Sequence, residues 1–211
     1  MRVLLTGYGP FGGEPVNPSA QLVTALAAGP RPHPRIELSA AVLPVDSRRF
    51  RGALEAALAA SRAELVVGVG QAAGREDVEL EALAHNALDF GDETDNGGHA
   101  AHGEPLAADG PPRLHVRLPL AALAARLVER GLPVRVSLDA GRHLCNALLY
   151  ELLLRHPERP ALFVHVPLLT EQAARRAQDE PSLPAEVSRD CLAALLGLLA
   201  ERTHGLPPER L

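Results

Sequence analysis

Cys145 has the setting best suited to chemistry in this 211-residue chain. Residues 132–137 favour a strand, a glycine follows at 141, and residues 144–154 are strong helix formers without Gly or Pro. Cys145 is therefore predicted in the first turn of a helix. Unpaired N–H groups and the helix dipole there favour a thiolate, lowering a cysteine pKa from about 8.5 to roughly 3.5–7.5. The sequence indicates a nucleophile, although a small core cysteine would show the same pattern.

A nucleophilic thiolate needs a base, and the chain has nine histidines. His143 is nearest, but two positions on a helix are about 200° apart, so its side chain should face away from Cys145. His165 lies in the strand-forming run 161–167, and sites form at the carboxyl ends of parallel strands. We therefore expect His165 to be the base, with a structural histidine as the alternative.

The acidic residue that would orient this base is predicted in the segment 78–84. Glu79 and Glu81 alternate with apolar residues and so share one face of an extended segment. The pattern does not choose between them, and a solvated strand face would show the same alternation.

The elements that must position these side chains alternate regularly between strand and helix. Asn17 followed by proline is typical of a helix start, and Asp46 is expected to cap the next helix. The run 64–70 is apolar on both faces, as are parallel strands covered by helices. The sequence predicts one α/β domain over residues 1–211, a three-layer α/β/α sandwich with a largely parallel twisted sheet. The expected strands are 2–6, 35–43, 64–70, 132–137 and 161–166, and the expected helices are 18–28, 46–60, 120–130, 144–154 and 185–201.

Composition excludes several classes of function. All 21 basic residues are arginine, so Schiff-base chemistry, a P-loop lysine and a Ser-Lys dyad are excluded. A net charge of -5, no clustered basic patch and few aromatic residues argue against nucleic-acid binding. Two cysteines form no disulfide framework or metal motif, and no signal peptide or membrane span is found. We expect a cytoplasmic protein with reduced thiols and no membrane partner.

The segment 91–112 interrupts the alternation of strand and helix. It is rich in Gly, Asp, His and Pro, too polar to pack and too long for an ordinary connection. It is predicted to be a mobile flap that excludes water, with a disordered surface insertion as the alternative. His99, His102 and Glu104 could be imagined as metal ligands, but nothing around them suggests a rigid supporting shell, so no metal site is predicted.

The first loop contains the pattern Gly7-x-Gly9-x-x-Gly12 of dinucleotide-binding proteins. That motif requires a helix that opens within the glycines, whereas the expected helix here waits until residue 17. Tyr8 and Phe11 lie inside the pattern and could instead enclose a small flat group. A plain strand-to-helix turn is the alternative.

Several separated motifs resemble the pyrrolidone carboxyl peptidases, also called pyroglutamyl-peptidases I. The resemblance covers essentially the whole chain and keeps the order of the motifs. The matching segments are Thr6 to Gly13 with Asn17-Pro18, Gly70-Gln71-Ala72-Ala73-Gly74-Arg75, Glu81 with Asn86, Ala140-Gly141 with Cys145-Asn146, and Val164 to Pro167 with Glu171-Gln172.

The resemblance implies a cytosolic cysteine peptidase that removes an N-terminal pyroglutamyl residue from peptides. The implied catalytic residues are Cys145, His165 and Glu81, and no cofactor is required. Tyr8 and Phe11 resemble the aromatic pair that flanks the lactam ring.

The resemblance also implies roles for residues around these catalytic side chains and an assembly for the protein. Gln71 is a possible amide partner of the lactam, and the helix start at Leu144, with Arg75, could support the oxyanion. The assembly implied is a homo-oligomer, a tetramer or a dimer. Two alternatives are a catalytically weakened relative that still binds pyroglutamyl N-termini and a dinucleotide-binding protein.

The chain also departs from the family pattern. Tyr8 stands where phenylalanine is usual, and its hydroxyl would need a partner in a dry pocket. His143 replaces a bulky apolar or aromatic residue. After Asn86 the segment 89–96 lacks the family's arginine and carries an extra residue, which Arg75 could compensate. Cys191, in an apolar helical run, is expected to be buried.

Overall fold

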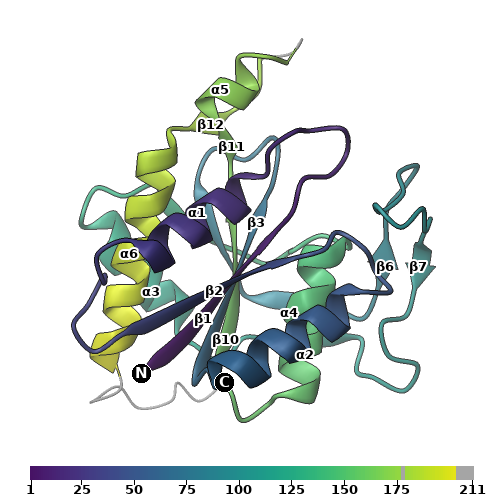
Figure 1. The fold of residues 1–211 in the computed structure, drawn as a ribbon, viewed down its shortest axis with the longest axis horizontal. Helices are drawn as coiled ribbons and strands as arrows, with labels where there is room; N and C mark the ends of the chain where they lie inside the picture. The colour runs from purple at the N-terminus through teal and green to yellow at the C-terminus, as the bar shows by residue number, and fades with distance from the viewer. Residues whose placement is uncertain (177–178, 203–211) are drawn as a thin grey trace.

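The computed structural model describes residues 1–176 and 179–202, and its centre is a six-stranded sheet (Figure 1). The strand order is β2-β1-β3-β10-β4-β9. The strands are β1 (Arg2–Tyr8), β2 (Glu37–Leu43), β3 (Leu65–Gln71), β4 (Val78–Glu81), β9 (Val134–Ser137) and β10 (Ala161–Val166).

The sheet is largely parallel, as predicted, but it changes direction once. Strands β2, β1, β3 and β10 run parallel, β4 pairs antiparallel with β10, and β9 follows β4. Strand β9 therefore runs antiparallel to β10. The antiparallel pair places β4 next to β10 with Glu79 opposite His165 and Glu81 opposite Phe163.

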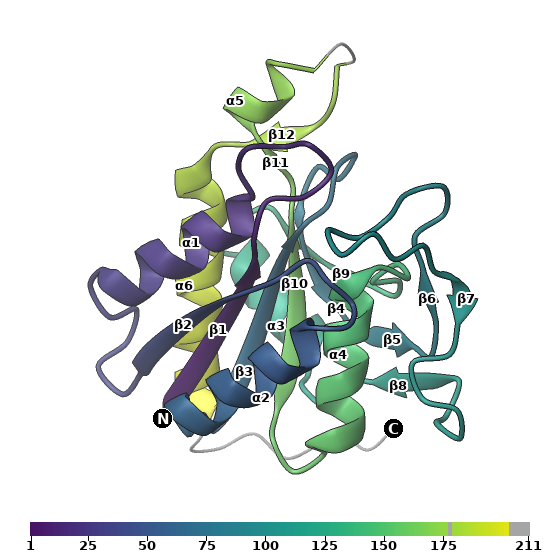
Figure 2. The same cartoon turned by 45° about the vertical axis from the view of Figure 1, so that its right-hand side comes forward.

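Helices cover both faces of the sheet and give the predicted three layers (Figure 2). Helices α1, α3 and α6 lie on one face, and α2 and α4 lie on the other. Their bounds are α1 (Pro18–Ala28), α2 (Phe50–Ser61), α3 (Leu120–Val128), α4 (Leu144–Arg155) and α6 (Ala185–Arg202). The side chain of Asn17 accepts a hydrogen bond from the Ser19 N–H at 3.1 Å, so the predicted cap of α1 is confirmed.

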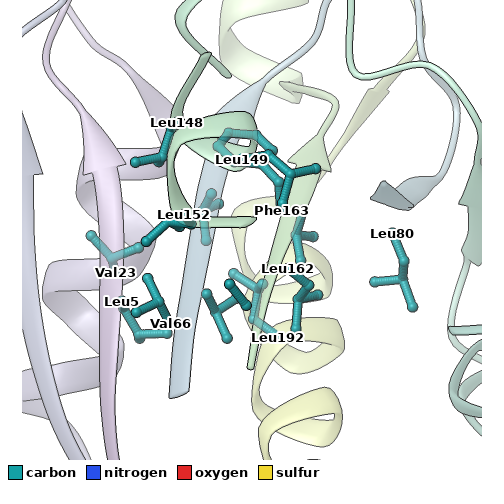
Figure 3. Packing of buried hydrophobic residues seen from close by; sticks show 14 of the residues in the cluster. Leu5, Val23, Val66, Leu80, Leu148, Leu149, Leu152, Leu162, Phe163 and Leu192 are labelled. Atoms are coloured by element: carbon teal, nitrogen blue, oxygen red, sulfur yellow. The ribbon is translucent and has the colours of Figure 1, made fainter. Parts of the chain in front are cut away.

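The core that fixes α4 on the sheet is apolar and closely packed (Figure 3). Leu148, Leu149 and Leu152 of α4 are buried against Phe163 of β10. Burying each such side chain stabilises the fold by about 1.5–3 kcal/mol. Gly68 is required here because a Cβ atom would lie 2.5 Å from Cδ2 of Phe163. The first turn of α4, which carries Cys145, is thus held against β3 and β10.

Short strands and one short helix complete the structure around the main sheet. Strands β5 and β8 pair antiparallel, as do β6 and β7, and β11 pairs parallel with β12. The bounds are β5 (Leu83–His85), β6 (Leu88–Asp89), β7 (His102–Glu104), β8 (Arg113–His115), β11 (Leu168–Leu169), β12 (Ser182–Leu183) and α5 (Thr170–Ala173).

The segment 91–112 packs against the body of the protein, contrary to what its polar composition suggested. Asp95 is only 4% exposed because its carboxylate accepts hydrogen bonds from the N–H groups of Ser47 and His99 at 2.7 and 2.9 Å. Burial alone would raise the pKa of Asp95, but these hydrogen bonds lower it to about 2. Polar side chains thus satisfy one another in this segment, and its mobility stays a prediction.

Candidate active site

Helix α4 begins with free backbone donors beside Cys145. The residue before the helix, His143, makes no side-chain capping bond, and the first backbone bond runs from the Ala147 N–H to the His143 carbonyl at 3.1 Å. Over residues 1–176 and 179–202, the preceding N–H groups of Leu144 and Cys145 find no acceptor. The predicted place of Cys145 in a first helical turn is confirmed, and its donors can receive an anion.

The sulfur of Cys145 lies directly over strand β3 and next to His165. A Cβ atom added at Gly70 would lie 2.8 Å from Sγ, and Gly70 is the register partner of His165. Cys145 and His165 line the same cavity. Burial by itself would lower the pKa of His165, but the charge and hydrogen bond of Cys145, with those of Glu81, raise it to about 9. The arrangement favours an imidazolium paired with a thiolate.

Glu81 is the acid that reaches the imidazole. Its Oε1 lies 2.7 Å from Nδ1 of His165, diagonally across the antiparallel pair. Glu79, opposite His165 in register, pairs instead with Arg75 and Arg135. Both glutamates are at most 1% exposed, so the alternative of a solvated strand face is wrong. The sequence left the choice between them open, and the structure makes it by side-chain reach.

A cavity of about 220 Å³ opens beside the sulfur. Its walls are mainly apolar, and the first loop supplies two of its aromatic rings. The Tyr8 hydroxyl donates a hydrogen bond of 2.7 Å to the Leu144 carbonyl, so it has the partner that a dry pocket requires. Burial and the charge of Cys145 raise the pKa of Tyr8, which keeps it neutral. The lining residues are Tyr8, Phe11, Asn17, Val45, Gln71, Ala140, His143, Leu144, Cys145 and His165.

A sequence profile described as pyroglutamyl peptidase matches residues 1–200. The chain belongs to the pyroglutamyl peptidase family. It is 42% identical over 213 residues to the pyrrolidone-carboxylate peptidase of Chromobacterium violaceum, covering 99% of this chain and 96% of the relative. The corresponding Vibrio vulnificus protein is 37% identical over 188 residues, covering 88% of this chain and 86% of that protein.

Solved structures show the same fold. Pyrrolidone carboxyl peptidase of Fervidobacterium islandicum superposes with a TM-score of 0.88 at 32% identity, covering 95% of this chain and 99% of that chain. Pyroglutamyl peptidase I of Bacillus amyloliquefaciens superposes with a TM-score of 0.86 at 30% identity, covering 97% and 99%. The expected family and the α/β fold are confirmed, and nothing favours a weakened relative or a dinucleotide-binding protein.

In this member of the pyroglutamyl peptidase family, His143 lines the cavity together with Cys145. The expectation that it faces away is wrong because His143 precedes the helix, so helical spacing does not apply to it. Its ring centroid lies 4.5 Å from that of Phe90 and 5.8 Å from that of Phe11. Its Nε2 is buried without a hydrogen-bond partner in the described part of the chain. Burial lowers the pKa of His143, which keeps the ring neutral.

Arg75 is not among the residues that line this cavity. Its guanidinium lies on the far side of the triad, where Nη1 is 3.2 Å from Oε1 of Glu81. Leu144 does line the cavity, and its carbonyl accepts the Tyr8 hydroxyl. Of the two residues expected to support an oxyanion, the structure therefore places Leu144 at the cavity and Arg75 behind the acid.

Two amide side chains position the site, and sequence reasoning gave them no role. Gln172 donates to the Oε1 of Gln71 at 3.3 Å and accepts from the Leu169 N–H at 3.0 Å, which orients Gln71 at the cavity. Asn146 follows the nucleophile and is fully buried. Its amide bonds both backbone groups of His85 at 2.7 and 2.9 Å and so fixes α4 to β5. The sequence pointed to Gln172 and Asn146 only because each lies in a segment that matches the family pattern.

The remaining candidate ligand patterns have other contacts. His99 uses both ring nitrogens, one 2.8 Å from Oγ of Ser47 and the other 3.2 Å from Oε1 of Glu104. In residues 1–176 and 179–202 no group of three or more His, Cys, Asp or Glu side chains is arranged to hold a metal ion. The loop after β1 turns at Gly12 and Gly13, and α1 begins only at Pro18, so no helix opens within its glycines. None of the described helices is long and apolar enough to cross a membrane.

Proposed function

We propose that this protein hydrolyses the bond after an N-terminal pyroglutamyl residue in peptides and proteins, with Cys145 as nucleophile. The observation that carries the proposal is the side-by-side arrangement of the Cys145, His165 and Glu81 side chains and the apolar cavity. The family supports the same reaction, because the matching profile and the named relatives are pyroglutamyl peptidases.

Acylation begins with attack of the Cys145 thiolate on the carbonyl carbon that joins pyroglutamate to the next residue. The carbonyl oxygen becomes an oxyanion, which the free N–H groups of Leu144 and Cys145 stabilise by about 3 kcal/mol each. The His165 imidazolium then gives its proton to the leaving nitrogen, the carbon–nitrogen bond breaks, and an amine departs. A pyroglutamyl thioester remains on Cys145.

Deacylation reverses these proton transfers. Neutral His165 takes a proton from a water molecule while the water oxygen attacks the thioester carbonyl. The carbon–sulfur bond breaks, pyroglutamic acid leaves, and the thiolate returns next to the imidazolium. Glu81 holds Nδ1–H of His165 throughout, which presents Nε2 to the sulfur. The sequence of steps needs neither a metal nor a cofactor.

Specificity for pyroglutamate follows from the uncharged residues that line the cavity around the catalytic pair of Cys145 and His165. Tyr8 and Phe11 supply apolar ring faces for the uncharged lactam, and Gln71 offers an amide group. An ordinary N-terminal ammonium would lose its water shell there without a carboxylate partner, since no Asp or Glu lines the cavity. Peptides with a free N-terminus are therefore excluded.

We propose that segment 91–112 acts as the flap of this site. The Nδ2 of Asn96 donates 2.8 Å to the Pro10 carbonyl, next to Phe11, and Phe90, just before the segment, contacts His143. Opening of the flap would admit a peptide, and closure would exclude water. Hydrogen exchange of the segment with and without 2-pyrrolidinone tests this, and equal protection in both conditions would contradict it.

We further propose that the protein acts in the cytoplasm as a homo-oligomer, a dimer or a tetramer. Two free cysteines, Cys145 and Cys191, suit a reducing compartment. Light scattering coupled to size exclusion measures the assembly, and a single species of 22.3 kDa would refute it. Cell fractionation tests the location.

The activity is tested with pyroglutamyl p-nitroanilide. Wild-type protein should release nitroaniline, and Cys145→Ala should not. Prolyl and glutamyl p-nitroanilides serve as controls for the lactam, and Cys191→Ala serves as the matched control for loss of a thiol. A folded, reduced wild type that does not cleave the substrate but binds 2-pyrrolidinone would replace the proposal with a binding function.

A further inference from the structure

Arg75 is the side chain that connects the acid of the triad to the rest of the fold. Its Nη1 lies 3.2 Å from Oε1 of Glu81, the same oxygen that accepts from His165. The other carboxylate oxygen of Glu81, Oε2, is buried and has no partner in the part of the chain that is described. The orientation of the carboxylate is therefore set by two contacts only, one from His165 and one from Arg75.

Arg75 also compensates a second buried charge. Glu79 lies on the same face of β4, is 1% exposed and contacts Arg75 and Arg135. Two carboxylates this close and this deeply buried repel each other, and a cation between them compensates this repulsion. Arg75 contacts both, whereas Arg135 contacts Glu79 and, at 4.0 Å, Asp77, and its side chain is 59% exposed. Arg75 is thus a cation shared by the two buried carboxylates.

The Arg75 guanidinium also contacts the loop that precedes the nucleophile Cys145. Its Nη1 lies 3.3 Å from Oγ of Ser137 and its Nη2 donates 3.1 Å to the Asp139 carbonyl. The Asp139 side chain in turn accepts from the Gly141 N–H at 3.1 Å and from Arg142 at 2.7 Å. Residues 137–142 lead directly into α4. One planar side chain therefore joins the strand of the acid to the loop before Cys145.

We propose that Arg75 is a positioning residue that acts through Glu81, compensating the buried carboxylates and aiming Glu81 at His165 while it fixes the loop before Cys145. The inference rests on the proposed function and adds a residue that does not touch substrate. Arg75 lies outside the cavity lining, so it is neither an oxyanion donor nor a ligand of the lactam. A lysine cannot replace it fully, because a single ammonium lacks the two-sided geometry of the guanidinium.

The decisive experiment compares Arg75→Gln with Arg135→Gln, which removes the other cation from Glu79. We expect Arg75→Gln to lower kcat by about 10²-fold, because the imidazole loses its orientation, and to leave KM within about threefold. Arg135→Gln should change both constants by less than about threefold. A rise in KM at unchanged kcat in Arg75→Gln would assign Arg75 to substrate binding and overturn the proposal, as would equal losses in the two variants.

A second measurement does not depend on turnover. The pKa of His165, about 9 in the wild type, is read by NMR titration of histidine-labelled protein. It should fall in Arg75→Gln, because Glu81 is no longer held against the imidazole, and stay in place in Arg135→Gln. An unchanged value in Arg75→Gln overturns the proposal. If the wild type is inactive but the pKa of His165 changes as expected in the two variants, the proposed peptidase activity is refuted. The positioning role of Arg75 is then still supported.

Should Arg75→Gln lose its cooperative unfolding transition, Arg75→Lys and Arg135→Lys take its place. Both keep a charge beside Glu79, but only the first removes the bond to the Asp139 carbonyl. A larger kcat loss in Arg75→Lys than in Arg135→Lys supports the proposal. Equal kcat values in these two folded variants refute it.

Discussion

Gly70 offers the sharpest test of the position of the nucleophile. The sulfur of Cys145 lies on strand β3, where only a residue without a side chain leaves room for it. A Cβ atom in Gly70→Ala would lie 2.8 Å from Sγ and 2.8 Å from Cζ of Phe163. Non-bonded heavy atoms settle at about 3.5–4.0 Å, so one neighbour must move by about 1 Å.

The sulfur is the neighbour that can move. Phe163 is fully buried between α4 and the sheet, whereas Cys145 is partly exposed and borders the cavity. A displacement of about 1 Å from His165 costs about 10²-fold in rate. That factor corresponds to about 2.7 kcal/mol in the activation free energy. Overpacking should also lower the free energy of unfolding by about 1–3 kcal/mol.

Gly68→Ala separates the two effects. Its Cβ atom would meet Phe163 at 2.5 Å and Leu148 at 3.1 Å, and the sulfur is not among its three nearest atoms. We expect Gly68→Ala to lose at least as much stability as Gly70→Ala and much less activity. Both variants therefore strain the packing around Phe163. Gly70→Ala is the variant that also places a Cβ atom next to the sulfur of Cys145.

The assay measures kcat/KM for pyroglutamyl p-nitroanilide and the free energy of unfolding in urea for each variant. The rate of Cys145 alkylation by iodoacetamide gives an independent measure of the thiolate. The reasoning fails if folded Gly70→Ala keeps wild-type kcat/KM. It also fails if Gly68→Ala and Gly70→Ala lose activity equally, since the loss would then follow packing rather than the sulfur.

Three further predictions concern protonation. The pKa of His165 is raised to about 9, so the stability from its ion pair is full below about pH 6.5 and is lost through pH 9. The pH profile of kcat/KM should fall on the alkaline side near 9, and a fall centred near 6.5 would contradict this. Burial lowers the pKa of His143, so the unfolded chain binds more protons and stability drops as pH falls below about 6.5. Urea unfolding at pH 5 and 7 should show a smaller drop in His143→Phe than in wild type, and equal drops would count against the buried neutral ring. Cys191 is 1% exposed with a pKa raised to about 12, so iodoacetamide at pH 7 should label Cys145 first; mass spectrometry would detect equal labelling, the opposing result.

Periodicity and capping signals predicted the main elements because each depends on neighbouring residues. The run 64–70 became β3, and the helix formers after His143 became α4, with bounds off by a residue or two. Asp46 was expected to cap a helix over residues 46–60, and the structure differs from this expectation. Its carboxylate accepts from the N–H groups of Arg48 and Arg49 at 2.9 and 3.1 Å, so it closes a turn and α2 begins only at Phe50. A capping residue marks the end of a loop more reliably than the first residue of a helix.

The sequence pattern could not predict the direction of β4 in the sheet. The position of Glu81, the acid of the triad, depends on this direction. Alternation put Glu79 and Glu81 on one face but gave no partner strand and no register. The antiparallel pairing with β10 sets Glu79 opposite His165, yet Glu81 reaches the imidazole diagonally while Glu79 pairs with Arg75 and Arg135. Long-range pairing of this kind comes from the whole fold.

The two departures from the family pattern at the cavity share one physical property. Tyr8 adds a hydroxyl, but its bond to the Leu144 carbonyl and its raised pKa keep it uncharged. His143 adds a titratable ring, but burial lowers its pKa and the ring packs against Phe90 as an apolar ring would. Both residues therefore present neutral surfaces to the cavity at neutral pH. An uncharged lactam requires neutral surfaces around its ring more than it requires particular aromatic residues, so either substitution is compatible with the reaction.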